Sequence, residues 1–314
     1  MSAIATSNIT LPRSVADEIV AKMGDNSVIQ TLSQSTPQLF SDVSHVLFTK
    51  EPEAEILGEG AQHGSSSAEF EAVPGNIKKA HVTVRMDQEV QWADEDNQLR
   101  IIDAITDASA KATARALDYL VLHAINPATG LAISGMTGLC SAAGVNVVDA
   151  TTDPSADLDS LSDALQNSGY DISGLAMAKA YASELRKLRT KNGNERIYPE
   201  IPLNLMAASV DGIAAATSNT VSGALAKTAT NVKAIMGDFN LIKWGIVRDL
   251  GMEIITMGDP DGLGDLKRLG QVAYRLEVVY GYATLDPSGF AVLKTKPASD
   301  GKTGETGDTE QTGK

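Results

Sequence analysis

The feature that most constrains this fold is a long stretch without helix breakers, since no glycine or proline stands between Trp92 and Pro127. Small and apolar residues recur within it at intervals of three and four, which is the period of an α-helix. They are Leu99, Ile102, Ile105, Ser109, Ala112, Ala116, Leu120 and His123 or Ala124. We therefore expect one helix over residues 94–125, about 45 Å long at 1.5 Å per residue, with Asp94 as its N-cap.

The expected helix has two chemically different faces. Small residues fill the middle of the inner stripe, where they let another layer approach closely: Ala108, Ser109, Ala112 and Ala116. Charged residues mark a solvated face: Arg100, Asp103, Asp107, Lys111 and Arg115. A helix of this length and pattern is expected to span a domain, and the rest of the chain is expected to be organised around it.

Composition bounds the class of protein. The 314 residues, 43% of them hydrophobic, suffice for one large or two smaller domains with a substantial core. The formal net charge of -14 argues against nucleic-acid binding, which needs an excess of Lys and Arg. No apolar run is long enough to cross a membrane, and residues 1–11 lack the basic and apolar regions of a signal peptide, so we expect cytoplasmic synthesis and no membrane contact.

Two short segments and a hairpin are expected before the long helix. Residues 12–23 have an apolar side typical of an amphipathic helix, and residues 27–34 predict a second short helix that either packs on the body or contacts a partner. Strands are expected over residues 45–49 and 81–86, the latter continuing to residue 92, with about thirty residues rich in Gly, Ser and Glu between them. The simplest fold is a two-stranded arm stabilised by another surface, and a disordered surface loop is the alternative.

An α/β region is expected after the long helix. A glycine-rich connection leads to a strand near residues 145–148. The later pattern predicts helices over 157–168 and 179–191 and strands over 172–177, 232–236, 241–245, 252–255, 272–284 and 289–293. Residues 297–314 hold no Val, Ile, Leu, Met or aromatic residue, so this tail is expected to be disordered.

Residue types that support metal or redox chemistry are sparse. The single cysteine, Cys140, excludes an intramolecular disulfide and is expected to be a small core residue. The histidines are never paired at i and i+4, so no zinc site is expected; they are His45, His63, His81 and His123. The sequence predicts no metal centre built on these residues.

Three short patterns resemble catalytic or ligand-binding motifs but fail on spacing. Ser141 lacks the G-x-S-x-G context of a nucleophile elbow. Residues 259–265 resemble a calcium loop, yet Leu263 and Gly270 stand at ligand positions, so a turn is expected and weak calcium binding is the lesser alternative. Gly262 and Gly264 lack the third glycine of a dinucleotide fingerprint. The sequence therefore predicts no enzyme and no cofactor.

The order of these parts resembles the major capsid protein family of tailed bacteriophages. The local patterns that carry the resemblance are Ser27-Val28-Ile29, Glu59-Gly60, Gly135-Met136-Thr137-Gly138-Leu139, residues 185–196 with Lys191-Asn192-Gly193, Gly237-Asp238-Phe239, Arg248 and residues 278–293. Each pattern is short, but their order and spacing extend over nearly the whole chain.

The resemblance implies an α+β capsid fold with four parts and a tail. These are an N-terminal arm over residues 1–41, an extended hairpin called the E-loop over 42–92, a peripheral domain over 93–134 and 251–296 with the spine helix 94–125, an axial α/β domain over 135–250, and the tail 297–314.

The resemblance also implies a function and partners. Copies of the chain would assemble as hexamers and pentamers into an icosahedral shell around double-stranded DNA, in the host cytoplasm, and become the virion capsid. A separate scaffolding protein is expected because the N-terminal arm is short, with a portal and an optional decoration protein as further partners, and with packaged DNA nearby but not specifically bound. The alternative is an encapsulin, a cellular compartment shell of the same fold. A hydrolase or dehydrogenase has only fold-class support.

Charged residues of the E-loop region are the expected inter-subunit contacts: Glu51, Glu53, Glu55, Glu59, Lys78, Lys79 and Arg85. Members of the family that crosslink themselves join a Lys to an Asn with help from a Glu. Lys50, Lys78 or Lys79 could supply the amine, but the Asn and Glu positions align near Arg268 and Arg275. We therefore expect no isopeptide bond.

Overall fold

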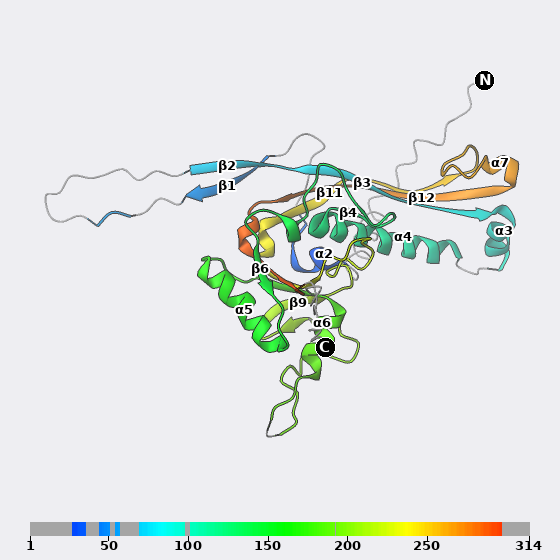
Figure 1. Ribbon diagram of the computed structural model, residues 1–314. Coiled ribbons are helices and arrows are strands. Elements are labelled where there is room, and N and C mark those ends of the chain that lie inside the picture. The colour runs from blue at the N-terminus through cyan, green and yellow to red at the C-terminus, as the bar shows by residue number, and fades with distance from the viewer. Residues whose placement is uncertain are drawn as a thin grey trace, which may run out of the picture.

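The computed structural model describes residues 27–35, 44–50, 54–56, 69–97, 101–191 and 193–296. It has an elongated upper part, built from a long sheet over helix α4, and a lower part that carries helices α5 and α6 (Figure 1). The expected amphipathic helix over 12–23 and the tail 297–314 lie outside the described residues.

The expected long helix is confirmed in its C-terminal two thirds. It consists of α4 (Ile101–Asp118), which continues as a π-helical turn (Tyr119–His123). The helix ends where Ala124 takes a left-handed conformation with φ 51°, three residues before Pro127. Only Gly and short polar residues adopt this conformation easily, so tertiary packing must impose it on the buried Ala124.

The start of the helix was predicted wrongly. Residues 88–92 are not a strand: a separate helix α3 (Gln88–Asn97) follows the strand β3 (Asn76–Asp87) directly. Asp94 lies inside α3 and is not an N-cap. The alternation of Val84, Met86, Val90 and Trp92 fits a strand, but β3 ends at Asp87, so that only Val84 and Met86 lie in the strand and Val90 and Trp92 lie in α3.

The buried face of α4 lies beside the predicted one. Ala110, Thr113, Ala114 and Leu117 are buried, as is the predicted Ser109. Ala112 and Ala116 are only half-buried, and Ala108 is exposed, which contradicts its assignment to the inner stripe. The buried face is therefore displaced by about one residue from the predicted face. Two adjacent faces of α4 carry small residues, and the helical period alone does not show which of them is buried.

A three-stranded antiparallel sheet lies over α4 in the order β11-β12-β3. The two expected strands 241–245 and 252–255 are one strand, β11 (Ile242–Ile255), with bulges after Ile246 and Asp249. The central strand β12 (Gln271–Thr284) is almost wholly buried because it has a neighbour on each edge and α4 beneath it. The strand β3 forms one edge of this sheet, so its outer backbone groups have no strand partner within it.

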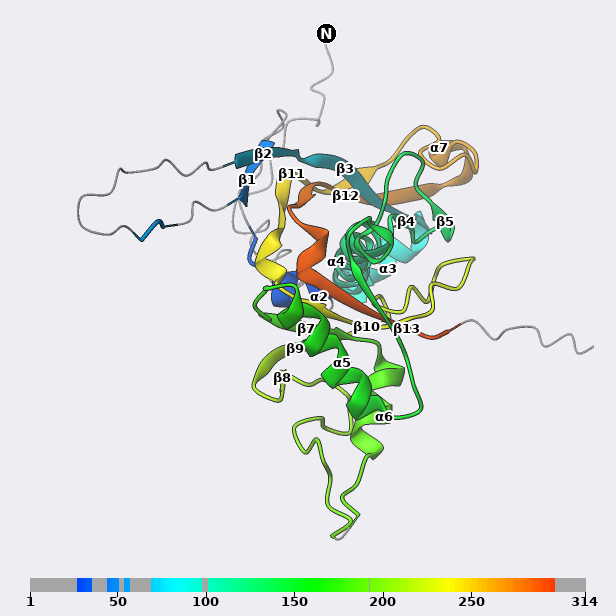
Figure 2. The ribbon, with the colours of Figure 1, turned by 60° about the vertical axis from the view of Figure 1, so that its left-hand side comes forward.

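A second sheet forms the lower part in the order β6-β13-β10-β7-β9-β8, with α5 and α6 packed against it (Figure 2). Its elements are β6 (Asn146–Asp149), α5 (Pro154–Asn167), β7 (Gly174–Met177), α6 (Lys179–Lys187), β8 (Ser209–Val210), β9 (Ile213–Thr217), β10 (Val232–Gly237) and β13 (Phe290–Lys294). The sequence patterns predicted all of these except β8 and β9, although α5 begins at Pro154, directly after its N-cap Asp153, rather than at residue 157.

Strand pairing bears on the domain limits, which stay a prediction. The strand β13 comes from the segment assigned to the peripheral domain, yet it pairs with β10 and with β6 in the lower sheet. It does so because Phe290, Val292 and Leu293 are completely buried there. The segment 251–284, by contrast, stays in the upper sheet.

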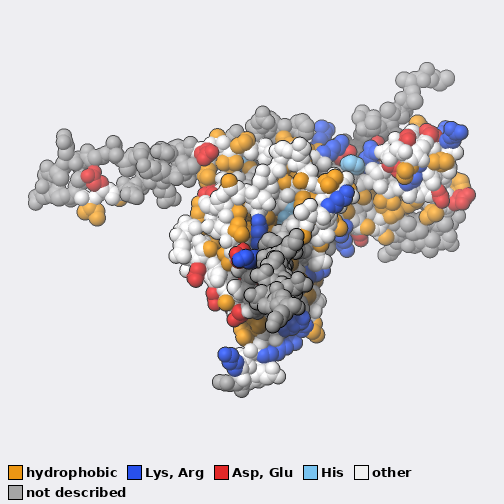
Figure 3. Space-filling view, viewed as in Figure 1, with side chains coloured by type: hydrophobic (Ala, Val, Ile, Leu, Met, Phe, Trp, Pro, Cys, Tyr) orange, Lys and Arg blue, Asp and Glu red, His pale blue; other side chains and the backbone are white. Residues whose placement is uncertain are grey.

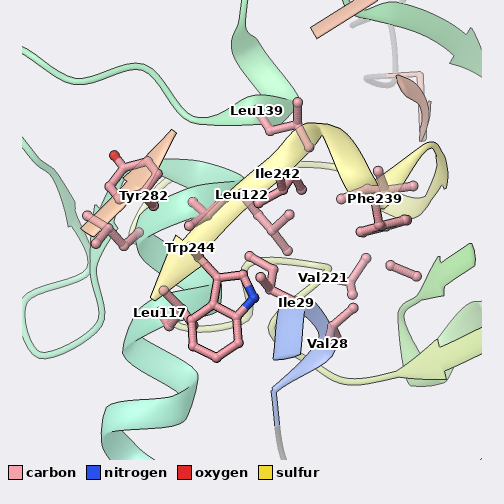
Figure 4. Close-up of a cluster of buried hydrophobic side chains, with 14 of the residues drawn as sticks. Val28, Ile29, Leu117, Leu122, Leu139, Val221, Phe239, Ile242, Trp244 and Tyr282 are labelled. Atoms are coloured by element: carbon pink, nitrogen blue, oxygen red, sulfur yellow. The ribbon is translucent and has the colours of Figure 1, made fainter. Parts of the chain in front are cut away.

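One hydrophobic cluster joins the two parts. Leu117 and Leu122 of the long helix meet Trp244 of β11 and Phe239, which lies in the turn before it (Figure 4). A second cluster fills the space between the lower sheet and α5 and α6. The side chains of the first cluster that Figure 4 labels come from several segments that are far apart in sequence, so this core depends on long-range contacts.

The short helix α2 (Val28–Leu32) confirms the helix expected over residues 27–34. Val28 and Ile29 are buried in the first cluster, so α2 packs on the body. The carboxylate of Asp118 accepts hydrogen bonds from the Val28 and Ile29 backbone NH groups, at 3.0 and 3.3 Å. It also accepts from the hydroxyls of Ser27 and Thr220, at 2.6 and 2.7 Å.

The remaining elements are short. They are the hairpin strands β1 (Ser44–Lys50) and β2 (Glu69–Pro74), the small hairpin β4 (Ile125–Asn126) and β5 (Leu131–Ala132), helix α7 (Leu266–Leu269), and the 3-10 turns Leu139–Ser141, Phe239–Leu241 and Pro287–Gly289. No helix of the described residues is long and apolar enough to span a membrane.

Candidate inter-subunit contact surfaces

The β1–β2 hairpin is the first candidate surface. The strands pair antiparallel, from Ser44 opposite Pro74 to Lys50 opposite Glu69, and form a sheet with no third strand among the described residues. The hairpin projects from the body, with the short segment 54–56 beyond its end (Figure 1). This confirms a two-stranded arm, although the partner of β1 is β2 and not the strand predicted over 81–86.

The far end of the hairpin is acidic and apolar. Ile56 is 98% exposed, and Glu55 beside it is exposed too. Figure 3 shows acidic and apolar side chains of the described segment together at this end. The other three expected contact residues of the loop, Glu51, Glu53 and Glu59, lie outside the described residues.

A groove between β3 and α4 is the second candidate surface. It has a volume of about 540 Å³ and runs beside the free edge of β3. Residues of β3, α4 and the β4–β5 hairpin line it, and four of them are cationic or histidine: Lys78, Lys79, His81 and Arg115. We call this feature the basic groove.

The expected contact residues Lys78 and Lys79 differ in their surroundings. Lys79 forms an ion pair with Glu277 of the neighbouring strand β12. Lys78 is exposed at the rim of the basic groove. Alternation along the strand places Lys78 on the same face as Ala80, which packs on the core, so Lys78 lies on the side of β3 that faces α4.

Arg85, the last expected contact residue, is held within the chain. Its guanidinium donates to the carboxylate of Asp261, to the Gln271 side chain at 3.1 Å and to the Gly264 carbonyl at 3.0 Å. A hydrogen bond from Arg85 lowers the pKa of the Asp261 carboxyl below its usual 3.8. The stretch 259–265 is therefore a turn that binds Arg85, and Asp265 caps α7.

The two positions aligned with the crosslinking residues both hold arginine, and contacts within the chain fix one of them. The guanidinium of Arg275 donates to the Thr83 hydroxyl at 3.1 Å and to the Pro260 carbonyl at 2.8 Å. Arg268 is exposed on α7. Neither side chain can accept a lysine amine in an amide bond, so the absence of an isopeptide bond stays our prediction.

An exposed apolar surface at the outer end of the long sheet was not expected from the sequence. We define the outer-end patch as the exposed apolar residues of this end: Trp92, Ile254, Met257, Leu263 and Leu269. They come from α3, the end of β11, α7 and the loop before it, which lie together in Figure 1. Large apolar side chains in a turn rich in Gly and Asp were the available signal, because such turns normally carry polar residues.

The buried ionisable groups have structural roles. Burial lowers the pKa of His123, whose Nε2 lies 3.0 Å from the Thr220 carbonyl. Burial raises the pKa of the Cys140 thiol to about 12, which confirms it as an inert core residue. Ser141 is exposed in a 3-10 turn, and no cluster of three potential metal ligands occurs among the described residues.

Comparison with known proteins identifies the family. The Phage capsid family matches residues 7–295. A solved structure from Mycobacterium phage Ogopogo is 34% identical with a TM-score of 0.77, covering 86% of this chain and 92% of that one. One from Gordonia phage Cozz is 30% identical with a TM-score of 0.74 and covers 87% of each chain.

A third structure supports the fold alone. It comes from Microbacterium phage Oxtober96, is 18% identical, and has a TM-score of 0.64 over 86% of this chain and 91% of that one. A search of curated proteins finds no match. With its mixed α+β architecture and long helix, and with the family matched over almost its whole length, the chain belongs to the phage capsid family: it is a structural major capsid protein of the virion shell and not an enzyme.

Proposed function

We propose that the chain assembles as hexamers and pentamers into an icosahedral shell that encloses the double-stranded DNA of a tailed bacteriophage. The observation that carries this proposal is the projecting β1–β2 hairpin, which ends in an almost fully exposed Ile56. An isolated two-stranded hairpin is at best marginally stable in water. The hairpin gains a stabilising surface when it lies over an adjacent subunit.

The other surfaces fit the same assembly. The outer-end patch supplies apolar area for contacts with further copies, because each of its residues is exposed in the isolated chain. In our proposal the axial domains, residues 135–250, gather at the five-fold and six-fold vertices, and the N-terminal arm reaches beneath a neighbour. Each contact is weak alone, and a closed symmetric shell sums many of them.

The net charge of the chain suits a container for DNA. At -14 it offers no general attraction for phosphates, so packaged DNA can lie beside the inner wall without specific binding. A separate scaffolding protein and a portal belong to the proposal, as partners that the shell needs for correct size and for DNA entry. A decoration protein on the outer surface is an optional further partner.

The test is the mass of the purified protein, measured by light scattering, with electron micrographs of the same fraction. Closed shells, or rings of five and six copies, are the expected result, with added scaffolding protein if the chain alone does not close. A monomer or dimer under all conditions would refute the proposal. Nucleic acid inside particles purified from the host would favour a phage shell, and enclosed enzymes would favour the encapsulin alternative.

A further inference from the structure

The end of α6 and the hairpin that follows it concentrate positive charge. Residues 186–196 hold five basic residues and one acidic residue, in a chain with 40 acidic and 26 basic residues. Four of the five basic side chains are exposed, and the fifth is half-buried. Lys and Arg side chains gather accordingly at the narrow lower end of the molecule (Figure 3). We call these five residues the basic tip: Arg186, Lys187, Arg189, Lys191 and Arg196.

Hydrogen bonds hold the hairpin of the basic tip against the end of α6. Arg189 and Arg196 face each other in an antiparallel bridge. The Thr190 NH donates to the Glu195 carbonyl at 2.9 Å. The Arg189 guanidinium donates to the Arg186 carbonyl in the last turn of α6, at 2.8 Å. The basic residues of the helix and of the hairpin are therefore kept together as one surface.

The basic tip has no acidic partner in the described part of the chain. None of the ion pairs between described residues includes one of its five members. Glu184, the nearest acidic residue of α6, is already paired with Lys233 at 2.8 Å. The Nε atom of Arg186 is buried and has no hydrogen-bond partner among the described residues. The tip therefore offers unpaired cations to an anionic partner outside the chain.

The chemistry of the basic tip fits the phosphate backbone of a nucleic acid better than the surface of another protein. Protein interfaces usually have an apolar core, but the only large apolar residue within 186–196 is Leu188, which is half-buried. Three of the five basic residues are arginines, whose forked guanidinium matches the oxygens of a phosphate. Contacts to phosphates position a protein on a duplex and carry no sequence information.

The acidity of the whole chain does not prevent such a local contact. The hairpin of the basic tip projects from the lower end of the molecule (Figures 1 and 2). Salt screens charges over about 8 Å at physiological ionic strength, so acidic residues farther away weaken the attraction little. We propose that the basic tip binds the phosphate backbone of double-stranded DNA. This inference rests on the proposed function and names a surface through which the shell protein contacts the enclosed DNA.

The experiment measures the affinity of the unassembled full chain for a short fluorescein-labelled DNA duplex, by fluorescence anisotropy at several salt concentrations. Each phosphate contact contributes about -0.9 to the slope of log affinity against log salt concentration. For about three to five contacts, the affinity should fall about 50- to 500-fold between about 50 and 200 mM salt. Two duplexes of different sequence should bind equally well. No binding at about 50 mM salt, or a clear preference for one sequence, would overturn the proposal.

A double variant tests whether the basic tip is the binding surface. Lys187→Gln with Lys191→Gln should reduce the salt slope by about two and weaken binding about 10- to 100-fold at about 100 mM salt. The matched control is Lys111→Gln with Lys267→Gln, which removes the same charge from exposed lysines of α4 and α7. It should leave affinity and slope unchanged. Circular dichroism checks the fold, which exposed substitutions should not alter. Equal weakening by the two pairs would overturn the assignment to the tip.

A competitor tests the chemical class of the partner. Unlabelled DNA should displace the labelled duplex more strongly, per negative charge, than polyglutamate does. Equal displacement would mean that the tip takes acidic protein segments as readily as DNA, and it would overturn the assignment to DNA.

The binding measurement needs no shells, so its outcome is separate from the test of the proposed function. Shells that form normally from a chain whose unassembled form binds no DNA overturn this inference alone. Absence of shells under all conditions refutes the proposed function, and with it the role of the basic tip inside a shell.

Discussion

The carboxylate of Asp118 offers the sharpest test of how this fold is held together. It is fully buried at the end of α4 and accepts four hydrogen bonds, two from the backbone of α2 and one each from Ser27 and Thr220. The variant Asp118→Ala removes the acceptor and leaves four donors buried. Each such donor costs roughly 1 kcal/mol or more, so we expect a loss of about 3–5 kcal/mol in the free energy of unfolding.

The measurement is urea unfolding of the unassembled protein, followed by Trp fluorescence. Trp244 is buried in the same cluster, and its indole NH donates to the Ser33 carbonyl at 3.2 Å, directly after α2. The variant Thr220→Val removes one donor and should cost about 1 kcal/mol. The control Asp103→Ala, exposed on the same helix, should change stability by less than about 0.5 kcal/mol. Equal stability of Asp118→Ala and Asp103→Ala would refute the reasoning.

Four further expectations follow. Burial raises the pKa of the Asp118 carboxyl above 3.8, so the folded protein binds this proton more tightly than the unfolded chain. As the pH falls from the folded pKa toward 3.8, the free energy of unfolding of the wild type should therefore rise relative to that of Asp118→Asn. Stability curves of the two proteins that run parallel with pH would contradict this expectation. Cys140, with its pKa near 12, should react with iodoacetamide at pH 8 only after unfolding, measured by mass. Gly138→Ala should lower the melting temperature, because the new Cβ would lie 2.4 Å from the His123 carbonyl carbon, whereas Gly169→Ala meets no atom within 4 Å and bears only its φ of +78°. Shell stability should fall as salt rises if glutamates pair with basic residues across subunits, and salt-independent shells would refute that pairing.

Local signals predicted most of the elements. The absence of Gly and Pro together with the period of three and four predicted α4, because a helix of that length depends on its own sequence and on one buried face. The long apolar runs predicted β12 and β13 for a similar reason, since strands buried on both faces must be apolar throughout.

The errors occur where distant residues decide. Residues 213–217 are mostly alanine, which has a low strand propensity, and they form β9 only because β7 pairs alongside and buries Ala215 and Ala216. The partner of β1 was misassigned because two alternating segments competed for it, and β3 instead pairs with β12, almost two hundred residues away.

The same limit applies to the candidate contact residues, because the sequence shows their charge but not the distant residues that they meet in the fold. Charge alone marked Arg85 as a contact with another subunit, which stays a prediction, and it did not show the acceptors Asp259 and Asp261, which lie more than 170 residues away in sequence and meet Arg85 in the fold. Asp118 gave no signal at all, since an aspartate inside a helix resembles a solvated residue until Ser27 and Thr220 are placed beside it. Ile56 is 98% exposed, and in our proposal the surface that covers it belongs to another copy.

The proposed contact of the hairpin with an adjacent subunit has a consequence for symmetry. The hairpin and the surface that it covers are different parts of one chain, so in our proposed assembly this contact is heterologous: each copy gives its hairpin to one neighbour and takes the hairpin of another. Such a contact closes into a ring when the rotation between copies divides a full turn, and otherwise it grows into an open chain. Five and six copies require two slightly different rotations from one sequence. The β1–β2 hairpin has no third strand among the described residues, so it can bend between these rotations more easily than the three-stranded sheet β11-β12-β3.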